Sequence, residues 1–214
     1  MKKRIFIGYL FFFYLLWIVY VKAFYPYIQV LDPNSTAFVL INLFARILIW
    51  VIPAIIYLRL SNSQTFSIKG LFKPTFRGFL IALLIALTMF LANLVLLGIP
   101  SFNFHGIDLN TYINTIVLVP LIEEFVFRGV ILNSILEIVH SETNVIENIL
   151  TSVLFVGIHV PGWLLYSPNI PIYLPFTLFI LSLILGFLSI KYKSILPSSL
   201  LHSLNNLFSS IFWI

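Results

Sequence analysis

Long apolar runs alternate with short polar segments along most of the chain. A helix needs about 20 residues to cross the ~30 Å hydrocarbon core of a bilayer, and the apolar runs come close to that length or exceed it. They cover residues 5–21, 37–58, 78–98, 112–136, 146–165, 172–190 and 196–213. The pattern predicts an all-α fold, a polytopic membrane helix bundle of about seven transmembrane helices. Pro161 and several polar residues make the fifth and seventh runs the least regular.

The composition supports a membrane protein and excludes several kinds of site. Hydrophobic residues make up 61% of the 214 residues and charged residues only 9%, against about 25% charged in a typical soluble domain. So few charges cannot cover a surface that faces water, and most of the surface must therefore face lipid. The absence of cysteine excludes disulfides, zinc–thiolate sites, iron–sulfur clusters and thiol nucleophiles.

The cations outside the apolar runs lie mainly on one side of the predicted bundle. With the N-terminus placed inside, the outer loops hold only Lys22, and the inner segments hold nine cations: Lys2, Lys3, Arg4, Arg59, Lys69, Lys73, Arg77, Lys191 and Lys193. Cytoplasmic loops of membrane proteins carry such an excess of Lys and Arg, which predicts a cytoplasmic N-terminus. The net charge of +5 then needs no nucleic acid as a partner. The first run lacks a small-residue cleavage site, so we expect an uncleaved first span.

The fourth apolar run contains three charges where a membrane helix should have none. Glu123 and Glu124 lie about 17 Å into the run at 1.5 Å per residue, and burying a charge at such a depth is costly unless it is paired or functional. Glu124 and Arg128 are four residues apart, which places them on one helix face as an ion pair. Glu123 points about 100° away from Glu124 and has no partner along its own helix. We expect the Glu124–Arg128 pair to hold the site in its arrangement and Glu123 to be available for proton transfer.

Two further runs place polar side chains at a similar depth. His159 lies in the fifth run, and His202 and Asn206, four residues apart, share one face of the seventh. A single buried His or Asn more often makes a hydrogen bond between helices than takes part in catalysis, but a cluster at one level favours a functional site. Arg46 in the second run is interpreted as structural or snorkelling, and Asn133 as a helix-contact residue.

These residue types together suit the hydrolysis of an acyl bond, most plausibly a peptide bond. A carboxylate and an imidazole can activate a water molecule, which fits Glu123 with a histidine. A second histidine with an asparagine one turn away offers two donors to a developing oxyanion. The alternative is a zinc site in which Glu123, His159 and His202 are the ligands and water takes the open position. No HExxH helix supports that alternative.

Three motifs resemble those of a known family. They are Glu-Glu-x-x-x-Arg at 123–128, Phe-x-x-x-His at 155–159 and His-x-x-x-Asn at 202–206. In this order on late spans they resemble the CPBP family, also called Abi, which groups CAAX prenyl proteases with bacteriocin-processing and self-immunity proteins. The resemblance implies an intramembrane endopeptidase in which Glu123 and His159 activate water. It also implies that His202 and Asn206 form the oxyanion site and that Glu124 and Arg128 support the other residues.

The resemblance also shapes the remaining expectations. The motifs divide one integral membrane domain into N-terminal helices and loops (1–111) and CPBP-like catalytic helices (112–214). The expected partner is a membrane-associated peptide or protein such as a bacteriocin or a prenylated peptide, in a bacterial cell membrane. The family allows a metalloprotease as well as a glutamate-type enzyme, and the residues mildly favour the version without zinc or another cofactor. Two alternatives stay open: a non-catalytic self-immunity or scaffold protein, and a proton or ion translocator.

Overall fold

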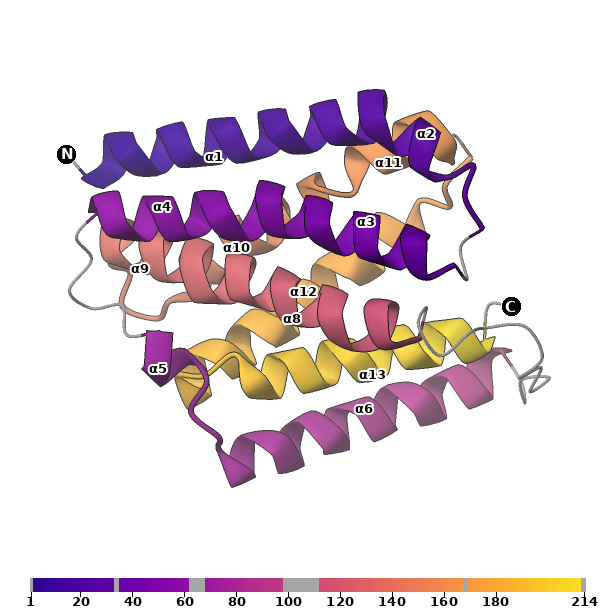
Figure 1. The fold of residues 1–214 in the computed structure, drawn as a ribbon. Helices are drawn as coiled ribbons and strands as arrows, with labels where there is room; N and C mark the ends of the chain where they lie inside the picture. Colours follow the sequence, from indigo (N-terminus) through magenta and orange to yellow (C-terminus); the bar gives the residue numbers. More distant parts are fainter. Residues whose placement is uncertain (1, 33–34, 62–67, 98–111, 168, 213–214) are drawn as a thin grey trace.

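Every regular element in the described part of the chain is a helix (Figure 1). The computed structural model describes residues 2–32, 35–61, 68–97, 112–167 and 169–212. The first half of the chain contains α1 (Lys2–Val19), η1 (Tyr20–Phe24), α2 (Tyr25–Ile28), α3 (Thr36–Arg46), η2 (Ile47–Val51), α4 (Ile52–Ser61), α5 (Ile68–Leu71) and α6 (Phe76–Leu97), where η marks a π-helical segment. Here η1 continues α1 into α2, and η2 joins α3 to α4 without a break.

The second half of the chain begins with one long helix built from four segments. These are η3 (Ile113–Leu118), α8 (Val119–Glu124), η4 (Phe125–Leu132) and α9 (Asn133–Val139). After them come α10 (Val145–Gly157), α11 (Val160–Tyr166), α12 (Tyr173–Tyr192) and α13 (Leu196–Phe212). The helices run roughly side by side between the two ends of the molecule, with the long helix 113–139 in the middle of the bundle (Figure 1).

The predicted all-α membrane bundle is confirmed, and the helix bounds follow the apolar runs closely. Among the described residues, five helical stretches are long and apolar enough to cross a membrane: Lys2–Ile28, Thr36–Ser61, Phe76–Val95, Val145–Tyr166 and Tyr173–Tyr192. The other two predicted spans, residues 113–139 and α13, do not meet that standard. The first contains Glu123, Glu124 and Arg128, and α13 has only 17 residues and is interrupted by polar ones. These two helices carry two of the three polar motifs, and the third, Phe-x-x-x-His, lies on Val145–Tyr166, which does meet the standard.

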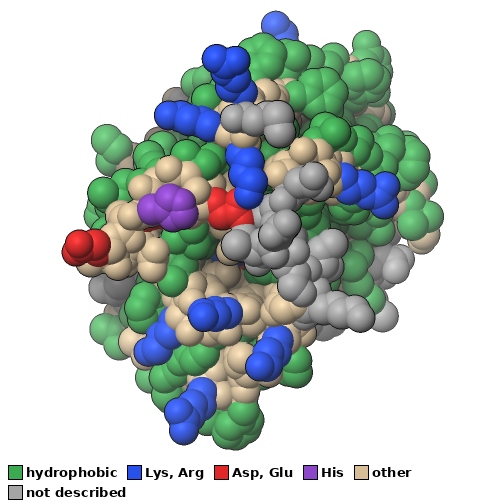
Figure 2. Space-filling model, turned by 90° about the vertical axis from the view of Figure 1, so that its left-hand side faces the viewer, with side chains coloured by type: hydrophobic (Ala, Val, Ile, Leu, Met, Phe, Trp, Pro, Cys, Tyr) green, Lys and Arg blue, Asp and Glu red, His purple; other side chains and the backbone are tan. Residues whose placement is uncertain are grey.

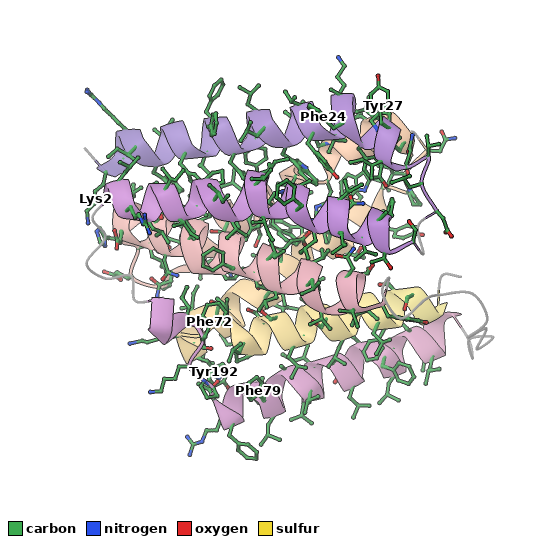
Figure 3. The ribbon with its side chains drawn as sticks, in the orientation of Figure 1. Lys2, Phe24, Tyr27, Phe72, Phe79 and Tyr192 are labelled. Carbon is green, nitrogen blue, oxygen red and sulfur yellow. The ribbon has the colours of Figure 1, made fainter. Side chains whose placement is uncertain are left out.

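The outer surface of the bundle matches a lipid environment. Large apolar side chains stand exposed along the sides, for example Phe11, Leu84, Val153 and Phe176. Such a surface would be an aggregation hazard in water and is favourable in lipid. Figure 2 shows Lys and Arg side chains spread over the end of the bundle at which the chain begins. Aromatic side chains lie near both ends, with Phe72, Phe79 and Tyr192 at this end and Phe24 and Tyr27 at the other (Figure 3).

The buried apolar side chains form two clusters. The larger one joins α1, η2 and α4 to the long helix and to α10, and Phe13, Trp50, Phe127 and Phe155 lie at its centre without exposure to solvent. The smaller cluster joins α6, α12 and α13 through Ala82, Ala86, Leu181, Leu185, Leu188 and Leu201. Side chains of η4 reach from the larger cluster toward α12, and α8 contacts α13. The polar motif residues lie along this junction.

Close packing between α10 and α12 sets the position of Ser182, which lies on α12 at this junction. A Cβ atom added at Gly186 would lie 1.9 Å from Asn148 Oδ1, and Asn148 Nδ2 donates to Leu183 O at 2.9 Å. Small residues allow membrane helices to approach closely in this way. One turn before Gly186, Ser182 is fully buried and faces the long helix through the contacts described next.

Candidate active site

The two glutamates lie on a short α-helical segment between two π-helical ones. Pro120 occupies the first turn of α8, and η4 begins directly after Glu124. π-Helical segments are rare and occur frequently at functional sites. All side chains from Val126 to Leu132 are buried, so this stretch of the long helix is enclosed by protein on every face.

Glu124 and Arg128 form the predicted ion pair. Arg128 Nη1 lies 3.1 Å from Glu124 Oε1, and neither side chain is exposed. Arg128 Nη2 also donates to Ser182 Oγ at 2.8 Å and to Ser182 O at 3.1 Å, and its Cζ lies 4.6 Å from the centre of the Phe155 ring. The arginine thus connects the long helix to α12 and α10, and its charge is compensated by a carboxylate.

His202 lies between the two glutamates. Its Nδ1 is 3.1 Å from Glu124 Oε1, and its Nε2 is 3.8 Å from Glu123 Oε2. A carboxylate accepts hydrogen bonds and cannot donate them, so Nδ1 carries the hydrogen. The Nε2 atom is therefore directed toward Glu123 at a distance too long for a direct hydrogen bond. A single water molecule about 2.8 Å from each atom would bridge such a gap.

His159 is similar to His202 in that its Nδ1 is held by an oxygen acceptor, and its Nε2 has no hydrogen-bond partner among the described residues. Nδ1 lies 3.1 Å from Phe155 O, a backbone acceptor that assigns the hydrogen to Nδ1. His159 lies at the break between α10 and α11, directly before Val160, and Pro161 follows in the first turn of α11. The Phe155 ring lies between the two imidazoles, at 5.3 Å from His159 and 5.8 Å from His202. His159 is close enough to Glu123 and His202 to interact with them electrostatically.

Asn206 approaches the site from the next turn of α13. Its Nδ2 donates to Thr115 O on η3 at 3.0 Å, which ties α13 to the start of the long helix. One N–H of an amide NH₂ group makes this bond, and the second N–H remains a potential donor. The side chain is half-buried, unlike Glu123, Glu124 and His202, which are buried.

The structure supports the structural interpretation of Arg46 over snorkelling, and it corrects the interpretation of Asn133 as a contact between helices. Arg46 does not snorkel to the membrane surface: its Nη1 lies 3.3 Å from Glu123 Oε1, so Glu123 does have a partner, on another helix. Arg46 is the eleventh residue of its span, about 15 Å from the nearer end, and this depth was the signal that could have indicated a buried partner. Asn133 contacts its own helix and donates to Arg128 O and Gly129 O.

The zinc site considered as an alternative would use Glu123, His159 and His202 as ligands. In the part of the chain that is described, no group of three or more His, Cys, Asp or Glu side chains is placed to hold a metal ion. The guanidinium of Arg46 also stands beside Glu123, and a fixed cation at 3.3 Å opposes the approach of a divalent one.

Comparison with known protein families agrees with the motifs. The family model described as type II CAAX prenyl endopeptidase Rce1-like matches residues 105–208. This range contains the Glu-Glu-x-x-x-Arg, Phe-x-x-x-His and His-x-x-x-Asn motifs and all helices from η3 to most of α13. Comparisons with the curated proteins and with the solved structures gave no match.

Proposed function

Because residues 105–208 belong to the Rce1-like family of type II CAAX prenyl endopeptidases, we propose that this integral membrane protein hydrolyses a peptide bond of a membrane-associated peptide or protein. The proposal depends on one observation in particular. Both histidines have Nδ1 bound to an oxygen acceptor, and the Nε2 atom that remains on His202 is directed toward Glu123. A carboxylate and two free imidazole nitrogens in a buried site are the groups that water activation requires.

The proposed reaction begins with proton transfer from water to Glu123. Glu123 and the free Nε2 of His159 hold the water, and the carboxylate removes one proton as the water oxygen bonds to the carbonyl carbon of the substrate. Glu123 suits this role better than Glu124, because Glu124 is already bound by Arg128 and His202 on the same oxygen. The first step thus gives a tetrahedral intermediate and a protonated Glu123.

The negative charge of the intermediate needs donors nearby. His202 supplies one in its imidazolium form, with the second proton taken from solvent before the substrate binds: Nδ1–H stays on Glu124 Oε1, and Nε2–H donates to the oxyanion. Asn206 supplies a second through the N–H that does not bind Thr115 O. Removing one donor of this kind from an oxyanion site typically costs about 10²–10³ in kcat. The C–N bond then breaks, and Glu123 returns its proton to the leaving amine.

The proposed orientation places the N-terminus in the cytoplasm. The starts of α1 and α6 and the ends of α4 and α12 lie at the end of the bundle at which the chain begins (Figure 1), and these segments or the residues beside them include Lys2, Arg59, Lys73, Arg77 and Lys191. Such an excess of cations is typical of the cytoplasmic side. In this orientation the loop that joins α9 to α10 also faces the cytoplasm, because α9 ends and α10 begins there (Figure 1). A bacterial cell membrane is the location we propose.

A direct assay tests the activity. We expect purified protein in liposomes to cut at least one of three probes at a single bond: a farnesylated peptide ending in a CAAX sequence, its unprenylated counterpart, or an apolar membrane-spanning peptide. The products are identified by mass spectrometry. If all three probes stay intact over long incubation, the peptidase proposal fails and the non-catalytic immunity or scaffold alternative gains support.

The metal-free mechanism makes a separate prediction. Because Arg46 stands beside Glu123 and no three-ligand group is present in the described residues, we expect hydrolysis to survive 1,10-phenanthroline and EDTA. Elemental analysis of the purified protein should find zinc well below one ion per chain. A stoichiometric zinc content, together with loss of activity on chelation and recovery on zinc addition, would overturn this mechanism.

A further inference from the structure

Arg46 comes from a part of the chain that the family match does not include. It is the last residue of α3, far in sequence from the matched residues 105–208. Yet its guanidinium lies 3.3 Å from Glu123 Oε1, with side-chain exposures of 21% for Arg46 and 8% for Glu123. A pair so far removed from solvent is much less screened than a surface pair. The N-terminal helices therefore contribute a charge to the proposed active site.

Two tryptophans fix the position of this guanidinium. Arg46 Cζ lies 5.7 Å from the centre of the Trp17 ring and 5.5 Å from that of the Trp50 ring. Cation–π contacts of this length are attractive, and desolvation strengthens them. The two indole rings also pack edge to face, with centroids 5.0 Å apart. The arginine thus has little freedom to turn away from Glu123.

Trp17 also contacts the backbone beside the first histidine. Its Nε1 donates to Ile158 O at 2.7 Å, and Ile158 directly precedes His159 at the break between α10 and α11. One indole therefore borders the cation that holds Glu123 and bonds the peptide unit that leads into His159. Trp50, in contrast, has an Nε1 with no hydrogen-bond partner in the part of the chain that the structure describes.

We infer that Arg46 is a positioning residue of the active site, held in place by Trp17 and Trp50 and acting through Glu123. This inference rests on the proposed peptidase function. Arg46 occupies Glu123 Oε1 and leaves Oε2 on the side of His202 Nε2, 3.8 Å away. A carboxylate fixed by one oxygen presents the other in a constant direction, which is the geometry that a general base needs.

Kinetics of arginine variants test the inference. We expect Arg46→Met to lower kcat about 10- to 100-fold, as loss of a supporting contact to a reactive group typically does, with KM within about twofold of wild type. Arg46→Lys should restore part of kcat, because the ammonium can still reach the carboxylate. The matched control is Arg59→Met, an exposed arginine near the end of the same continuous helix, Thr36–Ser61, which should change neither constant. Wild-type kcat in Arg46→Met, or no recovery in a folded Arg46→Lys, would overturn the inference.

The two tryptophans provide a sharper comparison. Trp17→Phe and Trp50→Phe both keep an aromatic ring beside Arg46, but only Trp17→Phe removes a hydrogen bond. A lost hydrogen bond of about 1 kcal/mol corresponds to a few-fold to about tenfold effect, so we expect that loss of kcat in Trp17→Phe and almost none in Trp50→Phe. Equal effects of the two substitutions would contradict the proposed role of Trp17.

A stability measurement keeps the inference testable if no probe is cleaved. Thermal unfolding in detergent is compared for wild type, Arg46→Met, Glu123→Gln and the double variant. If Arg46 acts through Glu123, Arg46→Met should lower the midpoint less in the Glu123→Gln background than in wild type. Additive losses would overturn the contact whether or not the protein is a peptidase. Coupled losses without any cleavage would support the contact while the proposed function fails.

Discussion

Glu123→Gln is expected to abolish measurable peptide hydrolysis while the protein stays folded in the membrane. Glutamine has the shape of glutamate, and its carbonyl oxygen can still accept a hydrogen bond from Arg46 at the position of Oε1. It cannot accept a proton from water, and the loss of a general base typically lowers kcat about 10²- to 10⁴-fold. The measurement is the initial rate on whichever liposome-bound probe the wild type cuts.

The control for this variant is Glu142→Gln. Glu142 is exposed in the loop between α9 and α10, so its substitution changes the same charge without touching the site. We expect wild-type rates for it, and wild-type amounts of membrane-inserted protein for both variants. Full activity of Glu123→Gln would show that Glu123 is not the general base and would leave Glu124 as the candidate for that role.

Arg128→Met is expected to cause the largest loss of stability. It removes the cation from a pair with no exposed surface and leaves Glu124 charged inside the bundle. Breaking a buried ion pair by removing one partner costs about 3–5 kcal/mol of unfolding free energy. Ser182 loses its Nη2 donor as well, and with it a contact between the long helix and α12. Thermal unfolding in detergent, with Arg77→Met at the exposed start of α6 as control, measures the loss.

A second substitution separates stability from catalysis. Glu124→Gln combined with Arg128→Met removes both charges, so the double variant should unfold at a higher temperature than Arg128→Met alone. Its activity should stay low, because a neutral amide oxygen at position 124 stabilises a protonated His202 ring less than the carboxylate does. Recovery of activity together with stability would show that the pair serves only to hold the fold.

The helices and the local ion pair could be predicted from the sequence because both depend on short-range patterns. The apolar runs determine where helices start and end, and the four-residue spacing of Glu124 and Arg128 places them on one face. Motif order also indicated which helices would meet. These are properties of single helices or of their sequence order, and no knowledge of helix rotation is needed to obtain them.

The partners of Glu123 could not be predicted in the same way. The contact with Arg46 depends on how the helix Thr36–Ser61 is rotated against the long helix, and that rotation follows from side-chain packing in the larger apolar cluster. The position of His202 between two carboxylates depends in the same way on the rotation of α13. The π-helical segments around α8 shift the angular positions of all later residues. An ideal helix therefore gives only approximate directions for them.

The pairing of charges in the site has a consequence for the energy of the reaction. Each carboxylate has a guanidinium beside it, Glu123 with Arg46 and Glu124 with Arg128. Creating a new charge in a low-dielectric interior is expensive, whereas moving an existing one by a few ångströms costs far less. In the proposed reaction a proton passes from water to Glu123, the negative charge moves to the substrate oxygen, and the total charge stays constant in that step. The bundle could therefore host this ionic intermediate away from bulk water without a change of net charge as it forms.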